Sequence, residues 1–162
     1  MMKALLFLWV GVFVGWAIDI DTVRQQFEQA KSSKEATESL YKSLSTYTKD
    51  DPLLLAYKGA SLTLKARFLA DRGDKKKMVA EGIKTIETAV VASPKQVEIR
   101  LVRLAVQENS PKILKYKMNM AEDKQMILTN FAGQPKAVQS LIKRYAQQSA
   151  VFTDAERKQL GG

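Results

Sequence analysis

The spacing of apolar residues constrains this chain more than any other feature. Apolar side chains recur at steps of three and four residues along most of the sequence, as on one face of an α-helix. Residues 79–90 are an example, with apolar positions stepping 4, 3, 4. No segment alternates convincingly with the period of two that a half-buried strand requires. We therefore expect an all-α fold.

Capping residues between the apolar stretches predict where the helices begin and end. Ser, Thr, Asp and Asn accept hydrogen bonds from the first turn, and Pro suits the first helical position. Ser32 with Glu35 three residues later, for instance, forms the pattern of a capping box. The predicted boundaries are starts at Ser32, Asp51, Ser93, Ser110, Asn119, Gln134 and Thr153, a fourth helix over about 75–92, and an end at Gly133.

Two of the predicted helices, those that follow Pro52 and Pro94, carry apolar stripes on two sides. A helix of this kind needs neighbours on both sides. The predicted loops are short, and no linker is long enough to divide the chain. We expect residues 18–162 to form one domain of antiparallel helix pairs.

Residues 1–17 have the pattern of a secretory signal peptide. Lys3 precedes an apolar run over residues 4–14, and Gly15 and Ala17 place small residues at the cleavage site. We expect cleavage after Ala17 and export, with the periplasm as the compartment. The alternative is an uncleaved inner-membrane anchor over residues 4–18, which is shorter than the roughly 20 residues that span a bilayer.

Composition excludes several chemistries. The chain has no Cys and no His, so it has no disulfide, zinc-thiolate site, thiol nucleophile or Ser-His-Asp triad. Glu122 and Asp123 are adjacent, and on a helix they point about 100° apart, so they do not form a catalytic pair. We expect no enzyme activity, no cofactor and no metal.

Residues 82–94 resemble the second half of a tetratricopeptide repeat. That family places a small residue, a bulky one, Ala and Pro where this chain has Gly82, Ile86, Ala89 and Pro94. Gly59 matches the small residue of the preceding helix, which the family needs so that paired helices cross closely, and the resemblance covers about 52–106. It implies a short superhelical array of helix pairs that binds a protein or peptide on a concave face. The overall layout, including residues 111–116 followed by 122–124, also resembles small exported helical proteins of Gram-negative bacteria, a likeness that implies no activity.

The candidate partner-binding residues are Arg100, Arg103, Gln107 and Tyr116. The first three step 3 then 4 and share one face of the fifth predicted helix. Guanidinium groups in a groove would bind an acidic group of a protein or peptide. The alternative is an internal network in which these arginines pair with Glu98, Glu122 or Asp123, and the spacing of Tyr116 equally suits the core.

The chain carries 26 Lys and Arg against 17 Asp and Glu, a net charge of +9. Two clusters form the candidate basic surface: Lys75, Lys76 and Lys77, and Lys112, Lys115 and Lys117. They would bind anionic lipid or another polyanion, or else form only a solvated face. Nucleic acid is not an expected partner, because the sequence lacks an array of aromatic and basic residues.

The leading hypothesis is an exported, non-catalytic scaffold that binds a protein or peptide in an inter-helix groove. The alternative is a peripheral envelope factor held by its basic faces.

The predicted cleavage has a direct test. Trp9 and Trp16 are the only tryptophans, so a chain that begins at Ile18 gives no Trp emission. We expect the native protein to lack residues 1–17 by intact mass, to be Trp-silent and to fractionate with the periplasm. A full-length, Trp-fluorescent protein in the membrane fraction would establish the anchor instead.

Overall fold

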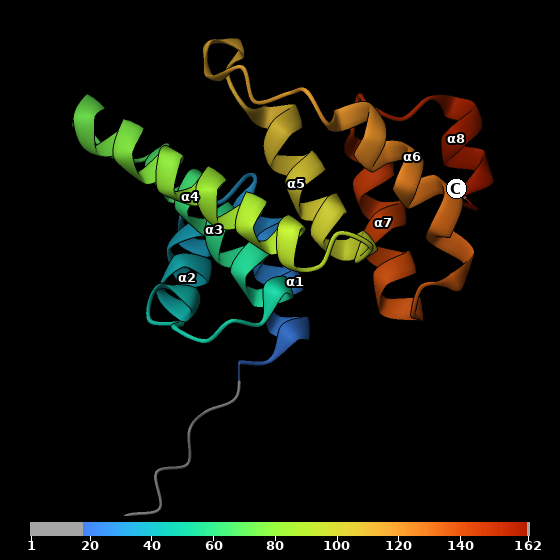
Figure 1. The fold of residues 1–162 in the computed structure, drawn as a ribbon, viewed down its shortest axis with the longest axis horizontal. Helices are drawn as coiled ribbons and strands as arrows, with labels where there is room; N and C mark the ends of the chain where they lie inside the picture. Colours follow the sequence, from blue (N-terminus) through green and yellow to red (C-terminus); the bar gives the residue numbers. More distant parts are fainter. Residues whose placement is uncertain (1–17, 162) are drawn as a thin grey trace, which may run out of the picture.

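A computed structural model describes residues 18–161. All regular structure in this range is helical, which confirms the predicted all-α class (Figure 1). The predicted signal segment 1–17, and with it nearly all of the alternative anchor 4–18, lies outside the described residues. The helices are α1 Ile20–Ala30, α2 Lys34–Ser45, α3 Pro52–Ala66, α4 Arg72–Ala92, α5 Val97–Asn109, η1 Lys112–Leu114, α6 Met120–Asn130, η2 Phe131–Gly133, α7 Lys136–Gln148 and α8 Asp154–Gln159.

Two predicted caps are confirmed and one moves by a residue. The Asp51 carboxylate accepts a hydrogen bond from the backbone N–H of Leu54 at 2.9 Å, and Thr153 forms a capping box with Glu156. Helix α2 is capped by Ser33, whose Oγ accepts from the backbone N–H of Ala36 at 3.1 Å. The prediction at Ser32 was therefore wrong by one position.

The predicted start of α4 was wrong by three residues. The carboxylate of Asp71 accepts a hydrogen bond from the backbone N–H of Asp74 at 2.8 Å and caps the helix there. Arg72 and Gly73 consequently belong to the first turn of α4.

The starts predicted at Ser93 and Ser110 were also wrong. Ser93 ends α4, and α5 begins only after a turn in which the N–H of Gln96 donates to the carbonyl of Ser93 at 3.1 Å. After Ser110 the chain forms a single 3₁₀ turn, η1, because Lys115 adopts a left-handed backbone with φ of 50° and stops it. Asn119 precedes α6 as predicted, but its side chain makes no cap hydrogen bond.

Helices α3 and α4 pack at backbone distance where two glycines meet. A Cβ atom built on Gly59 would lie 2.5 Å from the carbonyl oxygen of Gly82, and one on Gly82 would lie 2.6 Å from that of Gly59. Each carbonyl thus points into the space that a side chain of the other glycine would fill, as in the weak Cα–H···O contacts between helices. The structure therefore agrees with the expectation that small residues let these helices cross closely.

Helix α5 lies at the centre of the domain (Figure 1). It packs against α3, α4 and α6, and its residues from Val97 to Gln107 are all buried. Helix α3 likewise contacts α1, α2, α4 and α5. Both helices that were predicted to be apolar on two sides are covered on two sides.

Helices α6, α7 and α8 complete the fold beside α5. Helix α7 buries Val138, Leu141, Ile142 and Tyr145, the face that periodicity predicted. The ring of Phe152, just before α8, meets that of Tyr145 edge to face at 6.0 Å. Within residues 18–161 no helix has the length and apolar character needed to cross a membrane.

The glycine contact predicts a position-specific loss of stability. Gly59→Ala and Gly82→Ala should each lower the free energy of unfolding by about 2–3 kcal/mol, because the added methyl group meets a backbone oxygen and the helices must separate. Gly133→Ala is the matched control, since nothing lies within 4 Å of its built Cβ. Urea unfolding measures all three variants. An equal effect at Gly133 would contradict the explanation.

Candidate functional site

Two arginines of α5 form a buried ion-pair network with α6. Arg100 and Arg103 both contact Asp123 of α6, which is fully buried. Arg103 donates to the two carboxylate oxygens of Asp123 at 2.7 and 2.6 Å, and Arg100 donates to one of them at 3.0 Å. A single buried carboxylate therefore neutralises part of the charge of two guanidinium groups.

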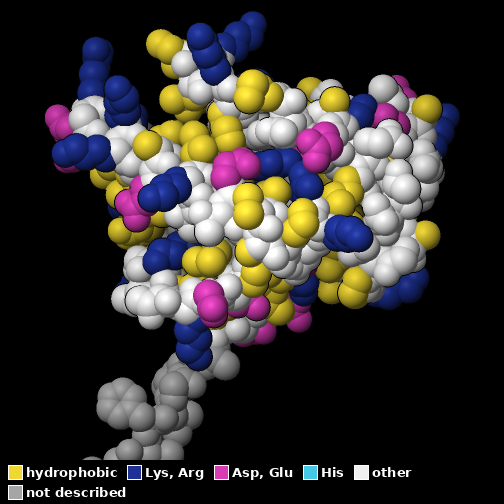
Figure 2. All heavy atoms as spheres, in the orientation of Figure 1, with side chains coloured by type: hydrophobic (Ala, Val, Ile, Leu, Met, Phe, Trp, Pro, Cys, Tyr) yellow, Lys and Arg dark blue, Asp and Glu magenta, His cyan; other side chains and the backbone are white. Residues whose placement is uncertain are grey.

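Two further carboxylates and a tyrosine extend this network to the surface. Glu122 accepts from Arg100 at 3.0 Å, and Glu87 of α4 accepts from Arg103 at 2.9 Å. The hydroxyl of Tyr116 donates to the other oxygen of Glu87 at 2.5 Å. The network thus joins α4, α5, α6 and the segment before α6, and Figure 2 shows acidic and basic side chains next to one another over the middle of this face.

The electrostatics of the network favour its charged form. Burial opposes the charge of Arg103, but hydrogen bonds to Asp123 and the charges of Asp123 and Glu87 raise the pKa of its guanidinium overall. The hydrogen bond from Asn119, followed by the charge of Arg100, lowers the pKa of Glu122. Burial raises the pKa of Tyr116, so its hydroxyl stays protonated as the donor to Glu87.

The arrangement matches the ion-pair alternative for Arg100 and Arg103. Both are buried, at 8 % and 3 % exposure, and carboxylates of the same chain occupy their guanidinium groups. A partner's carboxylate would have to displace one of these. Gln107 is also fully buried, and neither its amide nitrogen nor its amide oxygen has a hydrogen-bond partner among the described residues. Tyr116 is half-buried against the core.

A second buried ion pair on α5 involves Glu98 and was not predicted with these partners. Glu98 is 3 % exposed and accepts from Arg24 of α1 through both carboxylate oxygens, each at 2.7 Å. The hydroxyl of Tyr57 on α3 donates to the same carboxylate at 2.7 Å. Glu98 therefore pairs with α1 and α3, and not with Arg100 or Arg103 as the ion-pair alternative allowed.

The candidate lysines lie in two exposed places. Lys75, Lys76 and Lys77 belong to the projecting N-terminal part of α4, near Asp71 and Asp74. Lys112, Lys115 and Lys117 lie in the segment 111–118 between α5 and α6, here called the basic loop. The basic loop stands out at the top of Figure 1, and Figure 2 shows basic and hydrophobic side chains together there.

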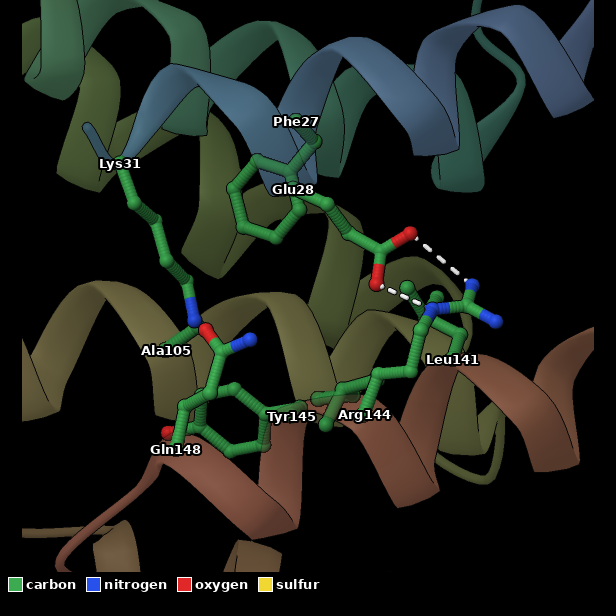
Figure 3. Close-up of a pocket in the computed structure, with 9 residues that line it drawn as sticks. Phe27, Glu28, Lys31, Ala105, Leu141, Arg144, Tyr145 and Gln148 are labelled. Atoms are coloured by element: carbon green, nitrogen blue, oxygen red, sulfur yellow. Dashed lines mark hydrogen bonds and ion pairs between the residues drawn. The ribbon is translucent and has the colours of Figure 1, made fainter. Parts of the chain in front are cut away.

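A groove beside α5, on the side opposite to Arg100 and Arg103, forms the other candidate site (Figure 3). Helix α1 forms one wall and helix α7 the other, while Leu101 and Ala105 of α5 form an apolar floor. We call it the α1/α7 groove. The wall residues are Phe27, Glu28 and Lys31 from α1, and Leu141, Arg144, Tyr145 and Gln148 from α7.

Lys31 is the distinctive residue of this groove. Its side chain points from α1 toward α7, and its ammonium lies 4.5 Å from the centre of the Tyr145 ring (Figure 3). Among residues 18–161 no carboxylate forms an ion pair with it, and burial lowers the pKa of its amine below the usual 10.5. The groove therefore holds a cation whose charge the surrounding protein only partly compensates.

An ion pair spans the groove beside Lys31. Arg144 donates to the two oxygens of Glu28 at 2.7 and 2.9 Å, in the forked geometry of a bidentate pair. Both residues are partly exposed, with 54 % of the Arg144 side chain and 30 % of the Glu28 side chain accessible. This pair ties α1 to α7 yet remains open to exchange with another carboxylate.

Sequence reasoning missed Lys31, although a signal for it was present. Lys31 follows Val23 and Phe27 at steps of four and so lies on the apolar face of α1. A lysine in that position faces a neighbouring helix rather than open solvent.

Within the described part of the chain, no group of three or more Asp and Glu side chains is arranged to hold a metal ion.

Comparison with protein-family models, with curated proteins and with solved structures finds no match to this chain.

The buried polar groups predict different effects for substitutions at Asp123 of α6 and Gln107 of α5. Asp123→Asn should lower the free energy of unfolding by about 3–5 kcal/mol, because two buried guanidinium groups lose their shared charge partner. Gln107→Met, which replaces an unpaired amide by an apolar group of similar size, should cost nothing or stabilise by about 1 kcal/mol. Chemical denaturation measures both. If Asp123→Asn were as stable as the native chain, the arginines would not depend on this carboxylate.

Proposed function

We propose that this protein is an exported, non-catalytic helical scaffold that binds an acidic segment of a protein or peptide partner in the α1/α7 groove. The supporting observation is Lys31, a half-buried cation beside an apolar floor and without an ion-pair partner among the described residues. The pattern of residues 1–17 supports export, and the resemblance of residues 52–106 to tetratricopeptide repeats supports a binding role.

The chemistry of the groove favours a carboxylate. Burial disfavours the ammonium of Lys31, and a carboxylate next to it would restore the lost stabilisation. The floor of Leu101 and Ala105 would at the same time cover a small apolar side chain next to that carboxylate. A short segment that combines an acidic and an apolar residue, or a chain terminus with a small apolar residue, fits both requirements.

The Glu28–Arg144 pair adds a second contact for an anion. Because the pair is partly exposed, its own contribution to stability is small. A second carboxylate of the partner would replace Glu28 on Arg144 at little energetic cost. The groove then offers two cations, Lys31 and Arg144, on opposite walls.

We thus keep an inter-helix groove beside α5 as the binding site, but place it on the other side of that helix and with other anchors than Arg100 and Arg103. Arg100 and Arg103 satisfy carboxylates of their own chain, whereas Lys31 does not. We therefore assign partner recognition to the side of α5 that carries Leu101 and Ala105. The network on the opposite side has the geometry of a structural element.

Substituting Lys31 separates a binding role from a structural one. Lys31→Met should abolish partner capture, while the thermal midpoint stays the same or rises, because a partly buried charge is removed and only a cation–π contact of about 1 kcal/mol is lost. A photo-crosslinking residue at the exposed, groove-lining Gln148 reports capture from native cell extract. Lys42→Met, at an exposed position of α2, is the matched control and should capture normally.

The crosslinked segment should carry Asp, Glu or a free carboxyl terminus. Capture that persists in Lys31→Met, or a Lys31→Met chain that unfolds, would refute the assignment. For the captured partner, affinity should also fall as pH rises through the lowered pKa of Lys31, below 10.5, since the amine loses the charge that the carboxylate binds.

A further inference from the structure

We propose that the basic loop, residues 111–118, docks this protein onto an anionic lipid bilayer. Ile113 and Met118 would insert among the lipid headgroups while Lys112 and Lys115 contact the lipid phosphates. The proposal is independent of the α1/α7 groove, because no residue of the loop lines that groove.

The loop concentrates exposed apolar side chains. Ile113 and Met118 are each 87 % exposed, and Leu114 is 39 % exposed. Among the described residues, two other large apolar side chains are as exposed as Leu114 or more. They are Phe68, which follows α3, and Val91 on α4, and both lie outside the loop. Single exposed apolar residues are ordinary on protein surfaces, whereas a group of them on one projecting segment marks an interaction site.

The fold holds these side chains outward. The Tyr116 hydroxyl donates to Glu87 at 2.5 Å, and the Lys117 ammonium donates to the carbonyl of Glu108, near the end of α5, at 2.7 Å. The 3₁₀ turn η1 lies between α5 and these two bonded residues. The N–H of Lys115 donates to the carbonyl of Lys112 at 3.0 Å and closes this turn. Tyr116 therefore faces the protein, and the exposure of Ile113 is a property of a hydrogen-bonded turn.

The charge of the loop complements an anionic surface. Residues 111–118 contain Lys112, Lys115 and Lys117 and no acidic residue. Lys117 is engaged with Glu108, which leaves Lys112 and Lys115 as the fully available cations. The projecting end of α4, with residues 75–77, lies toward the same side of the molecule in Figure 1 and adds positive charge, reduced by Asp71 and Asp74.

The shape of the loop favours a bilayer over a folded protein. Its apolar side chains stand on a convex projection, so a protein partner would need a matching pocket, whereas a bilayer interface accommodates any small apolar projection. Lysine side chains beside such a projection can extend their ammonium groups to the phosphates. Each lysine near an anionic membrane increases binding about fivefold.

The test is co-sedimentation with vesicles, using the chain as purified from cells. Vesicles of equal parts phosphatidylglycerol and phosphatidylcholine are compared with vesicles of phosphatidylcholine alone. Ile113→Ser/Met118→Ser should weaken binding to the anionic vesicles roughly tenfold, and Lys112→Gln/Lys115→Gln roughly 25-fold. Intact mass establishes that every variant has the same N-terminus, so any contribution of residues 1–17 cancels in the comparison.

Matched controls remove the same residue types elsewhere. Val91→Ser removes a side chain that is 80 % exposed on α4, and Lys95→Gln/Lys136→Gln removes two exposed lysines outside the loop. Both should bind the anionic vesicles like the native chain. Thermal midpoints should be unchanged in all loop variants, because the substituted side chains are exposed.

A second measurement reports insertion directly. The chain has no cysteine, so Ile113→Cys and Val91→Cys can each be labelled with an environment-sensitive dye. On anionic vesicles the dye at position 113 should shift to the blue and brighten, and the dye at position 91 should not. Binding that ignores the loop substitutions, an unshifted dye at 113, or a loop that captures a protein but no vesicle would each overturn the proposal.

Discussion

The burial of α5 from Val97 to Gln107 is the constraint on which the rest of this structure depends. Eleven consecutive residues of this helix are withdrawn from water, and several of them are charged or polar. A buried charge is tolerated only when it is paired. Glu98 meets this requirement through α1 and α3, and Arg100 and Arg103 meet it through α4 and α6. The surrounding helices are therefore held in place by the charges of α5 as well as by the apolar core.

Cations in this protein fall into two groups by how fully their charge is compensated. Arg24, Arg100 and Arg103 each meet buried carboxylates in directed hydrogen bonds. Lys31 lies over the ring of Tyr145 and feels the charges of Glu28 and Glu108 without forming an ion pair in the described chain, and Lys112 projects into solvent. The first group gives the domain a specific arrangement of helices. The second group retains attraction for an external anion, which is the physical basis for both proposals.

Local chemistry made much of the fold predictable. The periodicity of apolar residues located the helices, and the paired small residues Gly59 and Gly82 indicated the close crossing of α3 and α4. The Ser93–Pro94 start failed because the same residue types also form turns, and here Ser93 ends the preceding helix. Long-range pairings such as Arg24 with Glu98, separated by 74 positions, leave no local pattern. Lys31 escaped notice because a lysine at the end of an apolar stripe resembles an ordinary surface cation.

The pairing of α1 with late segments of the chain has a consequence for the order of assembly. Synthesis proceeds from the N-terminus, and domains order as their segments become available. The α3–α4 hairpin contains its own glycine contact and closes as soon as both helices exist. Helix α1 packs against α2 and α3, which follow it directly, but its ion pairs must wait, since Glu98 follows Arg24 by 74 positions and Arg144 follows Glu28 by 116. The Arg24–Glu98 and Glu28–Arg144 pairs thus form after α1 has neighbours to pack against, and the α1/α7 groove exists only in a chain whose synthesis has passed α7.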